Sequence, residues 1–128
     1  MSNISMTTPG NAGWIGYAGP QTKEAVKFYS EVMNWQMADL PMKDGSSIPG
    51  IMVGDGPIGG FSPQPEDVGV WTIYITVENV DEATERARTA GANILNGPND
   101  IPGVGRITTM IDPQGARIAM ITYESMQG

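Results

Sequence analysis

The chain has 128 residues, a formal net charge of −7 and a pI near 4.3. It contains neither cysteine nor histidine, which excludes disulfides, thiolate metal sites and cysteine nucleophiles and removes the commonest general base and metal ligand. The acidic balance disfavours nucleic acid and anionic membranes as partners. No apolar run reaches the length of a membrane span and no signal-peptide pattern opens the chain, so we expect a cytoplasmic protein with one folded domain.

The first part of the chain predicts one strand, one helix and three more strands. Residues 1–11 are polar, and we expect a flexible arm there, ahead of a single domain at residues 12–123. Trp14–Ala18 is a short strand candidate, and Thr22 is expected to cap a helix with a buried apolar stripe. The stripe consists of Ala25, Phe28, Tyr29, Val32 and Met33. Further strands are predicted at Trp35–Met42, Ile48–Val53 and Ile58–Phe61, with turns at Lys43-Asp44-Gly45 and Asp55-Gly56-Pro57.

The second part, residues 70–123, follows a predicted linker at residues 62–69 and repeats the pattern of the first, residues 13–61. Apolar and polar residues alternate from Trp71 to Val77, which predicts a strand. Asn79 and Glu82 form a capping-box pattern at the start of a helix, and Gly91 is suited to end it. Two later runs, Arg106–Ile111 and Ala116–Tyr123, flank Asp112-Pro113-Gln114-Gly115, a tetrapeptide typical of a type I turn. The two runs are therefore predicted to form a hairpin.

The two halves also resemble each other in sequence. A shift of about 58 residues places Ala25 on Ala83 and aligns the two predicted helices, which indicates duplication. We predict an α+β fold in which two tandem βαβββ units form a curved mixed sheet. This sheet would enclose a cavity, with the helices outside.

These motifs resemble the vicinal oxygen chelate superfamily, which includes glyoxalase I, extradiol dioxygenases and bleomycin-resistance proteins. The likeness runs from Gly13 to Thr122 and looks most like a glyoxalase-related branch. It is carried by Trp14 with Phe28-Tyr29, Asn34-Trp35, Tyr74–Ala83, Ala90-Gly91-Ala92, Ile101–Arg106 and Asp112–Gly115.

The resemblance implies a divalent metal held by His, Gln and Glu side chains on the first and last strands of each unit. Trp14, Gly60, Thr72 and Ala119 fall at those four positions, and only the threonine hydroxyl is even a weak ligand. A slip of one residue offers Ile15, Trp71 or Ile118, which are no better. We therefore expect no metal and no other cofactor.

Three functions stay open from the sequence. The first is a metal-independent small-molecule-binding protein, as the resemblance to bleomycin-resistance proteins implies. The second is a vestigial fold whose cavity is filled by its own side chains. The third is a glyoxalase-like lyase, isomerase or dioxygenase acting on a small organic substrate and using Tyr74, Arg106 or Glu78. A homodimer is expected in each case, because the predicted sheet edges are exposed.

Six residues are candidates to contact the ligand: Trp14, Phe61, Thr72, Tyr74, Arg106 and Met110. Trp14 can stack on a flat molecule or simply fill the former metal site. Arg106 can bind a carboxylate, or it can pair with Asp100 or Asp112. Tyr74 offers a hydroxyl or packs at a strand edge. Arg117 is expected on the solvated outer face.

Overall fold

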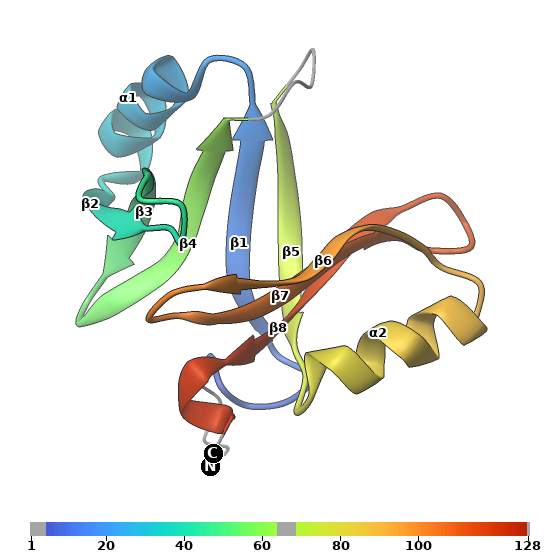
Figure 1. The fold of residues 1–128 in the computed structure, drawn as a ribbon. Coiled ribbons are helices and arrows are strands. Elements are labelled where there is room, and N and C mark those ends of the chain that lie inside the picture. Colours follow the sequence, from blue (N-terminus) through green and yellow to red (C-terminus); the bar gives the residue numbers. More distant parts are fainter. Residues whose placement is uncertain (1–4, 64–68, 128) are drawn as a thin grey trace. The chain divides into compact units, whose positions relative to one another are not determined.

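The predicted α+β class and the two βαβββ repeats are confirmed by the computed structural model, which describes residues 5–63 and 69–127 (Figure 1). The predicted linker falls largely outside the described residues, at 64–68. The first repeat is β1 (Ala12–Gly19), α1 (Thr22–Met33), β2 (Gln36–Pro41), β3 (Ser47–Val53) and β4 (Gly56–Pro63). The second is β5 (Val70–Thr76), α2 (Val80–Thr89), β6 (Asn93–Ile101), β7 (Gly105–Ile111) and β8 (Arg117–Tyr123), followed by a short 3₁₀ turn at Glu124–Met126.

Strand pairing is the same in both repeats. The first and last strands pair in parallel, β1 with β4 and β5 with β8. The remaining neighbours pair antiparallel, which gives the orders β2-β3-β4-β1 and β5-β8-β7-β6. A parallel first and last strand requires a crossover, and the helix of each repeat supplies part of it.

The described chain forms two compact units whose boundaries differ from those of the repeats. The larger unit contains the chain up to Trp14 and from Ile73 onward, and the smaller unit is Ile15–Thr72. The boundaries therefore cut β1 and β5, each of which contributes residues to both units.

In the larger unit, α2 packs on one side of β7 and β8. Val80, Ala83 and Met120 form the buried cluster, with Met110 packed against it. Two threonine hydroxyls lie in this interface, on Thr84 of α2 and Thr108 of β7, and are 2.9 Å apart. Thr84 also bonds the carbonyl oxygen of Val80 at 2.6 Å, so the buried hydroxyls satisfy each other's hydrogen bonds.

Both predicted ends of α2 are confirmed. The side chain of Asn79 accepts a hydrogen bond from the backbone N–H of Glu82 at 3.1 Å, as an N-cap should. Gly91 adopts a φ of 103°, and the N–H of Ala92 bonds the carbonyl of Ala87 at 2.9 Å. This is the left-handed C-terminal motif that glycine favours. The hairpin turn is confirmed too, since the N–H of Gly115 bonds the carbonyl of Asp112.

In the smaller unit, an aromatic cluster joins α1 to the sheet. Tyr29 of α1 lies at its centre, and its hydroxyl accepts a hydrogen bond from the indole N–H of Trp71 at 3.0 Å. Its ring lies 5.1 Å from that of Trp71 and 6.2 Å from that of Phe61, centre to centre. Phe61 is fully buried. The aliphatic side chains of Leu40 on β2 and Ile51 on β3 are buried in the same unit.

The predicted buried stripe of α1 is wrong, because no residue of the helix is buried and Ala25 and Tyr29 are only half-buried. Phe28, Val32 and Met33 are 56, 58 and 51 % exposed, because the helix contacts its sheet mainly through the side that carries Tyr29. The predicted cap is also displaced by one residue. Gln21 occupies the N-cap position and makes no side-chain cap bond.

Two further details differ from the sequence-based expectation. The turn between β3 and β4 is at Gly54-Asp55, one residue earlier than predicted, because Gly54 takes the left-handed φ of 58° that a two-residue hairpin needs. The sequence did not locate β6, which continues through Gly97-Pro98 with two register shifts against β7.

Residues 5–11 fold back on β5 of the larger unit. The N–H of Gly10 bonds the carbonyl of Thr76 at 2.8 Å, and the N–H of Thr76 bonds the carbonyl of Asn11 at 2.9 Å. The Thr76 hydroxyl donates to the carbonyl of Met6. Residues 5–11 therefore have defined hydrogen-bond partners on β5. The predicted flexibility of the N-terminal arm stays a prediction. Residues 1–4 lie outside the described residues.

The two phenylalanines of the chain provide a test of the aromatic cluster. Phe61→Ala is expected to lower the free energy of unfolding by about 3–5 kcal/mol, because it removes a fully buried ring. Phe28→Ala, the matched control, removes a ring that is 56 % exposed and should cost about 1 kcal/mol or less. Urea unfolding followed by circular dichroism measures both values, and equal losses would contradict this description of the cluster.

Candidate functional site

The sheet of the larger unit has two chemically different sides. Met120 packs under α2, so the residues that alternate with it along β8, Arg117, Ala119 and Ile121, point away from that helix. We call this side the far face. Register places Tyr74 of β5 and Thr109 of β7 beside Ala119, and therefore on the far face as well.

Tyr74 is a polar group of the far face that has lost much of its contact with water. Burial raises the pKa of the Tyr74 phenol above its ordinary value of 10.0, while a side-chain hydrogen bond with Thr109 and the positive charge of Arg117 lower it by less. The phenol therefore keeps its proton at neutral pH and can donate a hydrogen bond.

Tyr123, on the same side of β8, is also protonated at neutral pH. Burial raises the pKa of Tyr123 well above its usual range. Its hydroxyl donates to the carbonyl of Gly13, so this phenol holds the start of β1 within the larger unit. The Tyr123 hydroxyl is thus hydrogen-bonded to a backbone carbonyl, whereas the Tyr74 hydroxyl is hydrogen-bonded to the side chain of Thr109.

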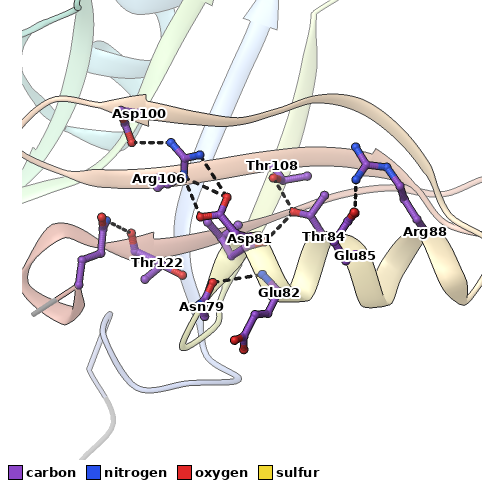
Figure 2. Close-up of polar contacts among 12 residues, drawn as sticks. Asn79, Asp81, Glu82, Thr84, Glu85, Arg88, Asp100, Arg106, Thr108 and Thr122 are labelled. Atoms are coloured by element: carbon purple, nitrogen blue, oxygen red, sulfur yellow. Dashed lines mark hydrogen bonds and ion pairs between the residues drawn. The ribbon is translucent and has the colours of Figure 1, made fainter.

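Arg106 lies on the opposite side, toward α2, and binds two carboxylates (Figure 2). Its guanidinium is 3.1 Å from Asp81, in the first turn of α2, and 3.1 Å from Asp100 on β6. The hydrogen bonds with Asp81 and then with Asp100 raise the pKa of Arg106. Pairing with Asp100 was one of the sequence-based alternatives and is confirmed. The other, Asp112, instead accepts the backbone N–H groups of Gln114 and Ala116 within its turn.

A groove of about 290 Å³ adjoins Arg106 at the N-terminal end of α2. Its charged groups, Glu78, Asp81 and Arg106, are of both signs, and the arginine already binds two carboxylates. Its lining is Glu78, Asn79, Val80, Asp81, Arg106, Thr122, Met126 and Gln127.

Two other predicted contact residues are part of the packing between helix and sheet. Met110 packs against the cluster under α2, and Phe61 is in the aromatic cluster of the smaller unit beside Tyr29 of α1. Both side chains face a helix, so neither lies on the side of the sheet where the ligand was expected. The sequence shows the alternation of residues along each strand, but it does not show which side of the sheet a helix covers.

The residues at the four implied metal positions do not fit a divalent ion. Trp14 and Ala119 of the larger unit are 3 and 0 % exposed and carry no ligating atom. In the smaller unit, Gly60 has no side chain and Thr72, 4 % exposed, has only a hydroxyl. Within residues 5–63 and 69–127, no three His, Cys, Asp or Glu residues are grouped as a metal site requires.

Comparison with known proteins points to a family. The model of the Glyoxalase/Bleomycin resistance protein/Dioxygenase superfamily matches residues 11–120. A protein of Mycobacterium tuberculosis named "Putative glyoxylase CFP32" is 30 % identical over 99 residues, which are 76 % of this chain and 38 % of that protein. The anthracycline biosynthesis protein DauV of Streptomyces sp. strain C5 is 26 % identical over 137 residues, 94 % of this chain and 50 % of DauV. The chain thus spans half or less of the length of these relatives.

Two solved structures have the same fold at low sequence identity. A variant methylmalonyl-CoA epimerase of Streptomyces coelicolor, in complex with 2-nitronate-propionyl-CoA, superposes with a TM-score of 0.61 and 18 % identity, covering 89 % of this chain and 94 % of that one. The methylmalonyl-CoA epimerase of Mycobacterium tuberculosis superposes with a TM-score of 0.59 and 15 % identity, covering 96 % of this chain and 93 % of that one. At these identities the likeness concerns the fold alone.

Within the part of the chain that the structure describes, neither α1 nor α2 has the length and apolar character that crossing a bilayer requires.

Replacing Arg106 separates a structural role from a binding role. Arg106→Gln is expected to lower the free energy of unfolding by about 1 kcal/mol, because partly exposed ion pairs contribute modestly. Thermal and urea unfolding measure this value. The affinity for any small ligand should stay unchanged, and a selective loss of affinity at unchanged stability would instead place Arg106 in the binding site.

The two buried phenols predict alkaline sensitivity. Because the folded-state pKa values of Tyr74 and Tyr123 are raised, their contribution to stability is fully present below pH about 10 and is lost as the pH rises through those values. Tyrosinate absorbance should show a late titration phase that shrinks in Tyr74→Phe and in Tyr123→Phe. A wild-type titration without a late phase would contradict the burial of both groups.

Proposed function

Because the chain belongs to the Glyoxalase/Bleomycin resistance protein/Dioxygenase superfamily, we propose that it binds a small organic molecule on the far face without a metal ion. The observation that carries the proposal is the residue set Trp14, Gly60, Thr72 and Ala119 at the positions where the resemblance implies metal ligands. A metal-dependent reaction needs ligating side chains, which these four residues do not supply.

The far face has the composition of a small-molecule site. Such sites combine mostly apolar walls with a few polar groups that fix orientation. Ala119 and Ile121 are apolar and fully buried, and Tyr74 and Thr109 carry hydroxyls.

Of the six residues predicted to contact the ligand, we retain Trp14 and Tyr74, which both belong to the larger unit, while Thr72 belongs to the smaller unit and stays a prediction. Trp14 is retained for its position on β1, at the first implied ligand position; its ring is 3 % exposed, so contact with a ligand requires neighbouring side chains to move. Phe61, Met110 and Arg106 are left out, because each already packs or pairs beside a helix.

The protonation of Tyr74 favours binding over proton abstraction. A phenol whose pKa is raised can donate a hydrogen bond to a ligand oxygen but is a poor general base at neutral pH. Glu78, the carboxylate considered as an alternative base, is exposed and lines the groove at the start of α2. A lyase, isomerase or dioxygenase activity therefore has less support than binding alone.

The test is native mass spectrometry followed by titration with matched aromatic acids and amides. The purified protein is expected to retain no stoichiometric divalent ion, and added Zn²⁺, Mn²⁺ or Ni²⁺ should not raise its melting temperature. Benzoate and benzamide, 2-naphthoate and 2-naphthamide, and anthraquinone carboxylate and its amide form the ligand panel. At least one pair should bind by calorimetry, and Tyr74→Phe should weaken that binding by up to about tenfold through loss of one hydrogen bond.

Two results would overturn the proposal. A stoichiometric metal that supports turnover would return the protein to the metal-dependent enzymes of the superfamily. Absence of binding across the whole panel would favour a fold filled by its own side chains.

We also propose that the protein is a homodimer, because β2 and β6 are the end strands in the strand orders of their repeats and present strand edges there. The same native mass spectrum measures the number of subunits.

A further inference from the structure

Asn96 and Gly97 form the one Asn-Gly pair of the chain, and the structure places this pair on β6. Asn96 is exposed, and residues 92–97 together with Arg88 line an open groove of about 510 Å³. The amide carbon of an asparagine side chain can be reached by the backbone nitrogen of the next residue through a five-membered ring. A glycine in that next position has no Cβ to block the approach. The pair therefore combines a reactive sequence with access to water.

The strand is irregular where the pair lies. Its register on β7 shifts between Ile94 and Asn96 and again between Asn96 and Asn99, so the register skips Gly97 and Pro98. Such shifts disrupt the hydrogen-bond ladder locally, and a proline has no N–H to donate to it. β6 is also the end strand of its repeat. The main chain around Asn96 is therefore held by fewer ladder pairs than a regular inner strand would provide.

The backbone requires glycine at position 97. Gly97 has a φ of 116°, which residues with a side chain rarely adopt. A Cβ there would also lie 2.6 Å from the carbonyl oxygen of Ile107 and 2.8 Å from the Cα of Thr108. Another residue at position 97 would therefore strain the strand, so the reactive pair can be removed cleanly only at position 96.

The side-chain amide of Asn96 has a hydrogen-bond donor at its oxygen. The Nδ2 group of Asn99 donates to Oδ1 of Asn96 at 2.7 Å. A donor at this oxygen stabilises the negative charge that develops on it when a nucleophile attacks the amide carbon. The bond therefore favours attack by the backbone nitrogen of Gly97.

We propose that Asn96 is a site of spontaneous covalent modification by deamidation. The backbone nitrogen of Gly97 forms a bond to the side-chain amide carbon of Asn96 and gives up its proton. The bond from that carbon to Nδ2 breaks, so ammonia leaves and a succinimide ring remains. Water then opens the ring at the side-chain carbonyl, which gives aspartate, or at the main-chain carbonyl, which gives isoaspartate. The net reaction consumes water, releases ammonia and turns an amide into a carboxylate.

The products change β6 in two ways. Both add a negative charge to the end strand of the sheet, and isoaspartate also inserts the Cβ atom into the main chain between positions 96 and 97. Because Gly97 lies close against the main chain of Ile107 and Thr108, the additional carbon is expected to displace it from β7. The modified chain should therefore unfold at a lower temperature than the unmodified chain.

The experiment follows the full chain over time in mildly alkaline buffer by tryptic digestion and mass spectrometry. Trypsin releases residues 89–106 as one peptide, which contains Asn93, Asn96 and Asn99. Asn96 is expected to convert first, because the other two asparagines are followed by isoleucine and aspartate, whose side chains crowd the attacking nitrogen. Electron-transfer fragmentation distinguishes isoaspartate from aspartate, and a zero-time sample corrects for conversion during digestion.

Two variants serve as matched controls. Asn96→Gln keeps an amide but needs a larger ring, so it should stop the conversion and keep the melting temperature of the fresh protein. Asn96→Asp has the charge without the additional backbone carbon and should melt above the isoaspartate-containing aged protein. An aged sample that melts no lower than the fresh one would overturn the expected displacement of β6.

A synthetic peptide of residues 89–106 separates the effect of structure from that of sequence. Conversion at Asn96 in the folded chain as well as in the peptide is the expected result. Conversion in the peptide but not in the folded chain would overturn the proposal, as would conversion spread evenly over the three asparagines. None of these results involves a bound ligand, so failure of this proposal leaves the proposed function untouched.

Discussion

The packing of α2 on β7 and β8 determines what each side of the larger unit's sheet can do. Val80 and Ala83 cover Met120, and the hydroxyls of Thr84 and Thr108 lie between helix and strand. A helix that covers one side commits every second residue of the strands to the core. The residues between them are then left for other roles. The chemistry of the far face is therefore a consequence of helix docking on the side away from it.

This constraint explains why local motifs were predictable from sequence and site residues were only partly so. The cap at Asn79, the stop at Gly91 and the turn at Asp112 each depend on residues within a few positions along the chain. Strand alternation was equally local. The side covered by a helix depends on tertiary packing, so Met110 and Phe61 were expected to contact a ligand but pack beside helices.

Long-range pairing sets a similar limit. Asp81 and Arg106 are 25 positions apart, and only the docking of α2 brings them to 3.1 Å. Asp100 is only six positions from Arg106, and the turn between β6 and β7 places the two opposite each other. In α1, spacing alone suggested a buried stripe, yet Phe28, Val32 and Met33 are exposed. A stripe shows that a helix is amphipathic, but the area of sheet available decides how much of it is covered.

Two arginines of one hairpin lie on opposite sides of the sheet in the larger unit. Arg106 of β7 binds Asp81 of α2 and Asp100 of β6, so one guanidinium links the helix to two strands and contributes to folding. Arg117 of β8 faces away from α2, and its positive charge acts on the Tyr74 phenol. Helix docking therefore separates the two charges, because it turns Arg106 toward the carboxylate in the first turn of α2 and leaves Arg117 on the side that carries Tyr74 and Thr109.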